Sequence, residues 1–131
     1  MPTVLIETCL QREPEAEVAL MNAVHAALVE AFKIPVNDRE VRLVVHAPHR
    51  FQAPLDRAHP ELYTLIGIDA FAGRSVDAKR KLFAAIVDKL EPLGIPRDHV
   101  LTTVRDHPLE NWGVRGGKAA CDIDLGFQVN V

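Results

Sequence analysis

Pro2 stands directly behind the initiating methionine and begins the apolar run TVLI. Removal of Met1 would leave Pro2 with a free secondary amine. An α-amino group has a pKa of about 7.7–8.0, and an apolar pocket lowers the pKa of a cation. Pro2 is therefore a candidate general base near neutral pH. The alternative is that Pro2 occupies the first position of a strand, where proline is tolerated.

Three arginines are candidates for binding a carboxylate, because a guanidinium presents a fork of donors that fits one. Arg12 and Arg74 stand before two expected helices, and Arg42 lies on an expected strand. A solvated surface charge is the alternative for each. An arginine is unusual beside a helix N-terminus, which favours anions, and the two together would make a good carboxylate site.

Asp38, in the string PVNDR, is a candidate for orienting water or polarising a catalytic amine, with a turn residue as the alternative. His25 lies in mid-helix among alanine and valine, where a partly buried, hydrogen-bonded histidine is the default. His46 and His49 have no carboxylate or cysteine at a convincing ligand spacing. We therefore expect no metal and no cofactor.

An internal repeat covers most of the chain, over about residues 2–51 and 62–112. FKIPVNDREVRLVVHAPHRF aligns with EPLGIPRDHVLTTVRDHPLENW at an offset of about sixty residues. Each half is expected to form strand, helix, strand, and a right-handed β-α-β connection makes the paired strands parallel. The chain is therefore predicted to be one α+β domain, residues 1–131. Its two tandem β-α-β units would form a four-stranded mixed sheet with two helices on one face.

The pattern also predicts the bounds of these elements. Pro14 suits a first helical turn, Ile34-Pro35 ends that helix, and Ser75 can cap the second. The nearly continuous apolar run over 62–71 is expected to be buried on both faces. The expected strands cover about 2–8, 40–46, 62–71 and 99–105, and the expected helices cover about 14–32 and 76–92.

The C-terminal segment alternates apolar residues with polar or small ones, which is typical of a half-buried strand. The apolar positions are Ile123, Leu125, Phe127, Val129 and Val131. We expect a strand over about 122–131. Two β-α-β units already supply four strands, so this fifth strand is expected to pair with another subunit.

Composition excludes several classes of protein. With 131 residues, 48% hydrophobic and 25% charged, the chain has ordinary globular composition. The net charge of −3 gives no basic surface for nucleic acid, and no apolar run is long enough for a membrane. The N-terminus is unlike a signal peptide, and Cys9 and Cys121 are far apart in the chain. These features favour the cytoplasm.

Pro2, the doubled β-α-β pattern and the glycine-rich NWGVRGG together resemble the tautomerase superfamily. NAVHAALVEAFKIPVNDR and AGRSVDAKRKLFAAIV are most similar to its long, two-unit members. These include malonate semialdehyde decarboxylase and cis-3-chloroacrylic acid dehalogenase. The resemblance implies catalysis by an amino-terminal proline and a homotrimer with sites near the subunit boundaries.

The resemblance also implies roles for single residues. Pro2 matches the catalytic proline, and Asp38 matches the aspartate that the decarboxylases use. Arg74 matches the second of two substrate-binding arginines, but Ala72 or Phe71 occupies the position of the first. The further matches with substrate-binding positions are Arg12, Arg42, His25 and Trp112.

The function implied is tautomerisation of a small 2-oxo acid, in which neutral Pro2 moves a proton and Arg74 holds the substrate carboxylate. Trp112, Phe51 and Phe71 are candidates for the apolar pocket walls. One alternative is a decarboxylase or hydratase of a small 3-oxo or unsaturated acid, using Pro2 and Asp38. An alternative of another class is a non-catalytic ligand-binding or assembly module.

Overall fold

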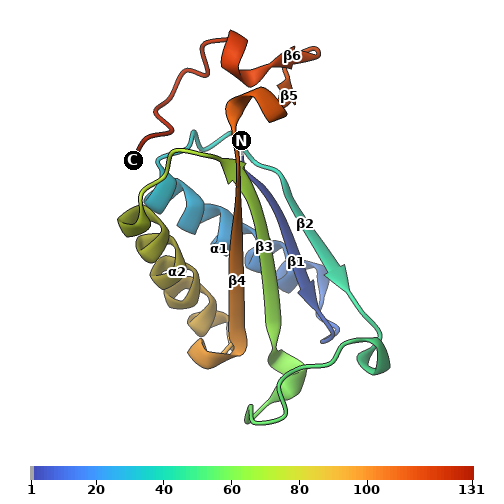
Figure 1. Cartoon of the computed structure of the whole chain (residues 1–131). Coiled ribbons are helices and arrows are strands. Elements are labelled where there is room, and N and C mark those ends of the chain that lie inside the picture. The colour runs from blue at the N-terminus through green and yellow to red at the C-terminus, as the bar shows by residue number, and fades with distance from the viewer. Residues whose placement is uncertain (1) are drawn as a thin grey trace.

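A computed structural model, which describes residues 2–131, contains a four-stranded sheet with two long helices on one face (Figure 1). A two-stranded hairpin stands above one end of this sheet. The elements of the sheet and its helices are β1 (Thr3–Thr8), α1 (Pro14–Phe32), β2 (Val41–Val45), β3 (Thr64–Phe71), α2 (Val76–Leu90) and β4 (Val100–His107). The hairpin is formed by β5 (Gly113–Val114) and β6 (Lys118–Ala119).

The sheet confirms the predicted pair of β-α-β units. Its strand order is β2-β1-β3-β4. β1 is parallel to β2 and β3 is parallel to β4, while β1 and β3 join the two units in antiparallel fashion. Ser75 caps α2 as predicted, since its Oγ accepts a hydrogen bond from the Ala78 N–H at 3.0 Å.

The apolar sequence of β3 predicted a strand buried on both faces. This prediction is wrong, because only one face of β3 is buried. Ile66, Ile68 and Ala70 are buried, whereas Leu65 and Gly67, at alternate positions of the strand, are half-buried. The reason is that both helices pack on the same face of the sheet (Figure 1). The core therefore forms between that face and the helices.

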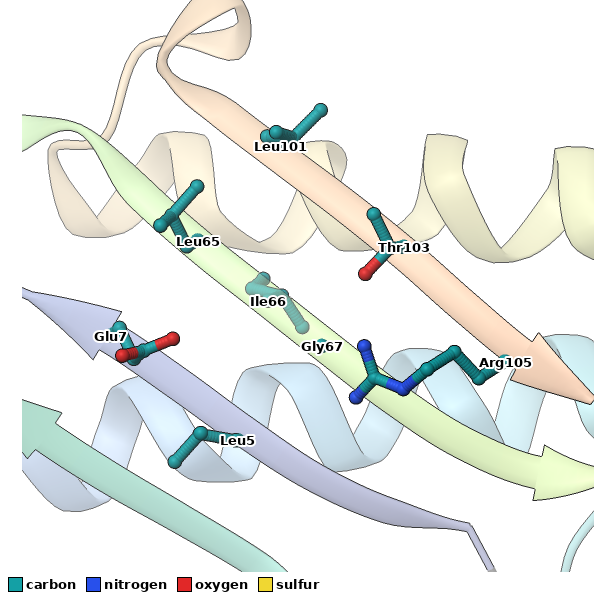
Figure 2. A pocket seen from close by; sticks show the side chains of 8 residues that line it. All are labelled: Leu5, Glu7, Leu65, Ile66, Gly67, Leu101, Thr103 and Arg105. Carbon is teal, nitrogen blue, oxygen red and sulfur yellow. The ribbon is translucent and has the colours of Figure 1, made fainter.

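The other face of the sheet is open. Leu5, Leu65 and Leu101 line a pocket of about 350 Å³ on it, and Leu101 is 50% exposed (Figure 2). Apolar residues on an uncovered sheet face commonly mark a contact with another protein surface. Among residues 2–131, no helix is both long and apolar enough to cross a membrane.

The predicted strand over 122–131 is wrong for the single chain. Residues 120–122 form a short 3-10 helix, and the residues after it form no strand. The apolar side chains instead pack on the chain itself, with the Phe127 ring stacked on Phe71 at 6.5 Å between centroids. The carbonyl of Val131 accepts a hydrogen bond from the Ser75 N–H at 2.9 Å. An alternating pattern arises equally from a chain that lies along an apolar surface.

Replacing Phe127 tests this packing. Because Phe→Ala costs about 3–5 kcal/mol in a core and Phe127 is half-buried, Phe127→Ala should lower the free energy of unfolding by about 2 kcal/mol. Urea denaturation measures this change, and Gln128→Ala, at the neighbouring exposed position, is the control. Equal stability of both variants would contradict packing of the C-terminal segment on its own chain.

Candidate active site

Pro2 lies at the end of the sheet where β1 and β2 begin and β3 and β4 end. Val4 pairs with Val41 on one side and with Ile68 on the other. Continuing both registers by two residues places Pro2 between Arg39 and Ala70. Pro2 is buried there. Pro2 is therefore flanked by the residues before β2 on one side and the residues after β3 on the other. These two segments come from different halves of the repeat.

Asp38 belongs to the turn that leads into β2. Its N–H donates to the carbonyl of Pro35 at 3.0 Å. His25 supports this turn from α1, because its ring is 2% exposed and its Nε2 lies 2.8 Å from the carbonyl oxygen of Val36. His25, which resemblance placed in substrate binding, thus holds the backbone two residues before Asp38.

Arg74 follows β3 and is 5% exposed. Its Nη1 donates to the Phe71 carbonyl at 3.1 Å, and its guanidinium lies over the Phe32 ring, 4.9 Å from the centroid. Nε and Nη2 have no hydrogen-bond partner among residues 2–131. Buried donors without partners are costly unless a ligand satisfies them, so Arg74 presents unused hydrogen-bonding capacity to an anion.

Electrostatics connects Arg74 with Asp38. Burial lowers the pKa of Arg74, while the carboxylates of Asp106 and Asp38 raise it. The fold therefore brings a carboxylate, a buried guanidinium and the buried Pro2 to one end of the sheet. Such a set can bind a carboxylate and move a proton beside it.

Arg12 and Arg42 lie at different distances from this end of the sheet. Arg12 lies beyond the far end of β1, and that end is about 20 Å from Pro2 at the rise of an extended strand. Arg42 is exposed on β2 and lines a pocket of about 350 Å³ with Thr3 and Arg39. Within one chain, Arg42 is thus close to the Pro2 end and Arg12 is not.

Trp112 forms the aromatic wall at this end, with Phe71 behind it. The two rings meet edge to face at 4.8 Å between centroids, and Phe71 is fully buried. Trp112 lines two pockets beside Thr3, of about 290 and 400 Å³. Within one chain Phe51 does not line this site, because it lies beyond the opposite end of β2 and stacks on His46 at 5.7 Å.

Sequence patterns did not indicate a third group of polar residues at this end of the sheet. Asp69 accepts hydrogen bonds from Arg105 Nε and from His107 Nε2, both at 2.8 Å. These two bonds hold the pKa of Asp69 down at about 2. Pairing of Asp69 with Arg105 across β3 and β4 becomes visible once the register is known. The repeat alone does not supply that register.

Gly67 leaves the space that this group needs. Figure 2 shows Arg105 reaching from β4 across β3 above Gly67. A Cβ atom at Gly67 would lie 3.2 Å from Nη2 of Arg105. The absence of a side chain on β3 therefore allows the guanidinium to lie flat and reach Asp69.

A family model described as "Tautomerase enzyme" matches residues 38–115, more than half of the chain. The chain belongs to this tautomerase family. The match begins at Asp38 and includes Arg74 and Trp112, while Pro2 lies before it.

Several solved structures share the fold across nearly the whole chain. FG41 malonate semialdehyde decarboxylase, inhibited by 3-bromopropiolate, is 29% identical with a TM-score of 0.80, over 88% of this chain and 91% of that chain. Another malonate semialdehyde decarboxylase, described with decarboxylase and hydratase activities, is 22% identical with a TM-score of 0.83, over 93% and 99%. A fused 4-OT symmetric trimer is 25% identical with a TM-score of 0.74, over 91% and 96%.

Asp69 should make stability depend on pH. Its pKa of about 2 lies below the ordinary value of 3.8, so its stabilising effect is complete above about pH 5 and is lost as the pH falls towards 2. With solvent screening included, the loss is about 1 kcal/mol. Asp69→Asn should remove this part of the acid sensitivity, as measured by urea denaturation at pH 7 and pH 3.

The control for this measurement is Asp56→Asn, which changes a carboxylate of an exposed loop. An Asp69→Asn variant that loses as much stability between pH 7 and pH 3 as the unchanged protein would contradict the assignment.

Proposed function

We propose that the protein is a cofactor-independent tautomerase of small 2-oxo acids, with Pro2 as general base after removal of Met1. The observation that carries the proposal is the burial of Pro2 next to the turn of Asp38 and the segment of Arg74. Desolvation there favours the neutral amine. A neutral amine can take a proton from the carbon next to a carbonyl and return it elsewhere.

Arg74 binds the substrate carboxylate in this proposal. Its unpartnered Nε and Nη2 fit two carboxylate oxygens, and Arg42 adds a second positive charge near Thr3. The charge that develops on the enolate is stabilised more strongly in a site from which water is excluded. Trp112 and the Phe71 ring behind it supply that apolar wall.

A second candidate function is decarboxylation or hydration of a small 3-oxo or unsaturated acid. Asp38 supports it, because His25 holds its turn beside Pro2 and because FG41 malonate semialdehyde decarboxylase is 29% identical. In that case Pro2 stays cationic and Asp38 positions water or substrate. The missing partner of Arg74, at Ala72 or Phe71, favours the tautomerase.

Two substitutions separate these functions. Pro2→Ala should lower kcat/KM for the ketonisation of phenylenolpyruvate by about a hundred-fold or more, because a freely rotating primary amine replaces the secondary amine that the proline ring holds in place. Asp38→Asn should lower it far less. Absorbance of the enol measures the rate, and the mass of the purified protein verifies that Met1 has been removed.

Equal and small losses of kcat/KM in both variants would contradict the proposed tautomerase function and favour a non-catalytic module. A decarboxylase activity that disappears in Asp38→Asn while ketonisation persists would establish the second candidate function instead.

We further propose that the protein is a cytoplasmic homotrimer. The open face of the sheet, with Leu5, Leu65 and Leu101, needs an apolar cover that one chain does not supply. The 25% identical fused 4-OT is a symmetric trimer. In a trimer, Arg12 would be available to a neighbouring subunit's site. The free thiols of Cys9 and Cys121 suit a reducing compartment.

Leu101→Asp tests this interface. A carboxylate on the open face should dissociate the trimer, because burying an unpaired charge is strongly unfavourable. Sedimentation velocity measures the state. The control is Leu93→Asp in the turn after α2, where the leucine is 43% exposed. A Leu101→Asp protein that sediments with the same mass as the control would contradict this assembly.

A further inference from the structure

We propose that His107 contacts the substrate and forms, with Thr3 and Asn111, a subsite for its carbonyl or enol oxygen. The inference rests on the proposed function, since it assumes that a 2-oxo acid or its enol binds beside Pro2. It adds a second polar contact, beside Thr3, to the carboxylate site of Arg74.

The His107 ring is held in one orientation. Its Nε2 lies 2.8 Å from Oδ1 of Asp69, whose low pKa of about 2 keeps it a carboxylate and therefore an acceptor. Arg105 fixes this carboxylate in turn, with Nε at 2.8 Å from Oδ1 and Nη2 at 3.2 Å from Oδ2. His107 Nε2 is thus the donor to Asp69, and the ring cannot rotate without breaking that bond.

This leaves Nδ1 of His107 for another molecule. Among residues 2–131, no group forms a hydrogen bond with Nδ1. In the neutral ring Nδ1 is an acceptor and suits an enol hydroxyl, whereas in the imidazolium it is a donor and suits a ketone oxygen. One nitrogen therefore matches both forms that a tautomerase substrate takes.

The pocket in front of His107 has the composition of a small-molecule site. It measures about 290 Å³ and is lined by Thr3, Asp69, His107, Asn111 and Trp112. A small ligand site combines an apolar wall with a few convergent polar groups. Here the wall is Trp112, whose ring meets that of His107 at 5.8 Å and whose Nε1 donates to the His107 carbonyl at 3.3 Å.

The pocket is also adjacent to the proposed base. Thr3 is the residue after Pro2, so their Cα atoms are about 3.8 Å apart. Phe71, three residues before Arg74, pairs with His107 across β3 and β4. A small 2-oxo acid held by Arg74 can therefore present its oxygen to one pocket wall while its carbon stays near Pro2.

A second histidine–carboxylate pair on the same sheet offers a matched control. His46 Nε2 lies 2.9 Å from Oε1 of Glu7, near the opposite end of β1. Its ring stacks on Phe51 rather than on Trp112. If these pairs served only to join strands, removing either one would have the same effect on ligand binding.

Trp112 is the single tryptophan of the chain, so its fluorescence reports ligand binding without requiring turnover. We would titrate the full-length protein with 2-oxopentanoate and with pentanoate, which differ only in the ketone oxygen. The unchanged protein should bind 2-oxopentanoate about ten-fold more tightly than pentanoate, the amount expected for one hydrogen bond to a polar or charged group.

His107→Gln should abolish this preference and leave the Kd of pentanoate unchanged, which also shows that the pocket is intact. Asp69→Asn should reduce the preference about three-fold, because an amide can present either its oxygen or its NH2 group and no longer determines which ring nitrogen carries the proton. His46→Gln should preserve it. A His107→Gln protein that keeps the ten-fold preference, or that weakens both ligands equally, overturns the subsite, as does an unchanged protein without the preference.

The outcome is separable from that of the proposed function. Loss of ketonisation in Pro2→Ala together with an intact preference in His107→Gln would refute the subsite alone. Full activity of Pro2→Ala would refute the tautomerase, while the titration would still measure whether His107 recognises the ketone oxygen.

Discussion

The antiparallel pairing of β1 with β3 is the contact on which the site depends. It joins the two β-α-β units and places β1 in the interior of the sheet, with β2 on its other side. The start of β1 is thereby enclosed by both halves of the chain. Without this pairing, Asp38 of the first half and Arg74 of the second half would belong to separate ends of separate units.

The same arrangement explains why charged groups can be buried at this end of the sheet. Burying one guanidinium without a counter-charge is strongly unfavourable. Arg74 is accompanied by the carboxylates of Asp38 and Asp106, by the Phe71 carbonyl and by the Phe32 ring. Within residues 2–131, Nε and Nη2 of Arg74 have no hydrogen-bond partner. Such donors lower stability unless a bound anion accepts hydrogen bonds from them.

The sequence predicted the elements well where the cause is local. Pro14, Ile34-Pro35 and Ser75 act on their own turns, and α1 begins and ends at the predicted residues. The parallel pairs followed from chain connectivity. Pro2, Asp38 and Arg74 came together in the prediction only through the family resemblance, since no local rule brings residues so far apart in sequence to one place.

The errors and omissions have a common physical origin, which is packing between distant segments. Alternation over 122–131 does not distinguish a neighbouring strand from the Phe71 surface that the segment covers. β3 is buried on one face only, because both helices pack on the same face of the sheet. The contact of Asp69 with Arg105 and His107 depends on register and on the space above Gly67.

Catalysis by Pro2 as general base requires a free amine that is neutral near pH 7. The most direct measurement is a pH titration of the protein labelled with [¹⁵N]proline, followed by nitrogen NMR. Of the nine prolines, Pro2 alone can have a titrating nitrogen, because the other eight are in peptide linkage. One titrating resonance is expected, with a midpoint below the ordinary α-amino range of about 7.7–8.0. A midpoint above that range, or no titrating resonance because Met1 is retained, would rule out an amine that is neutral near pH 7.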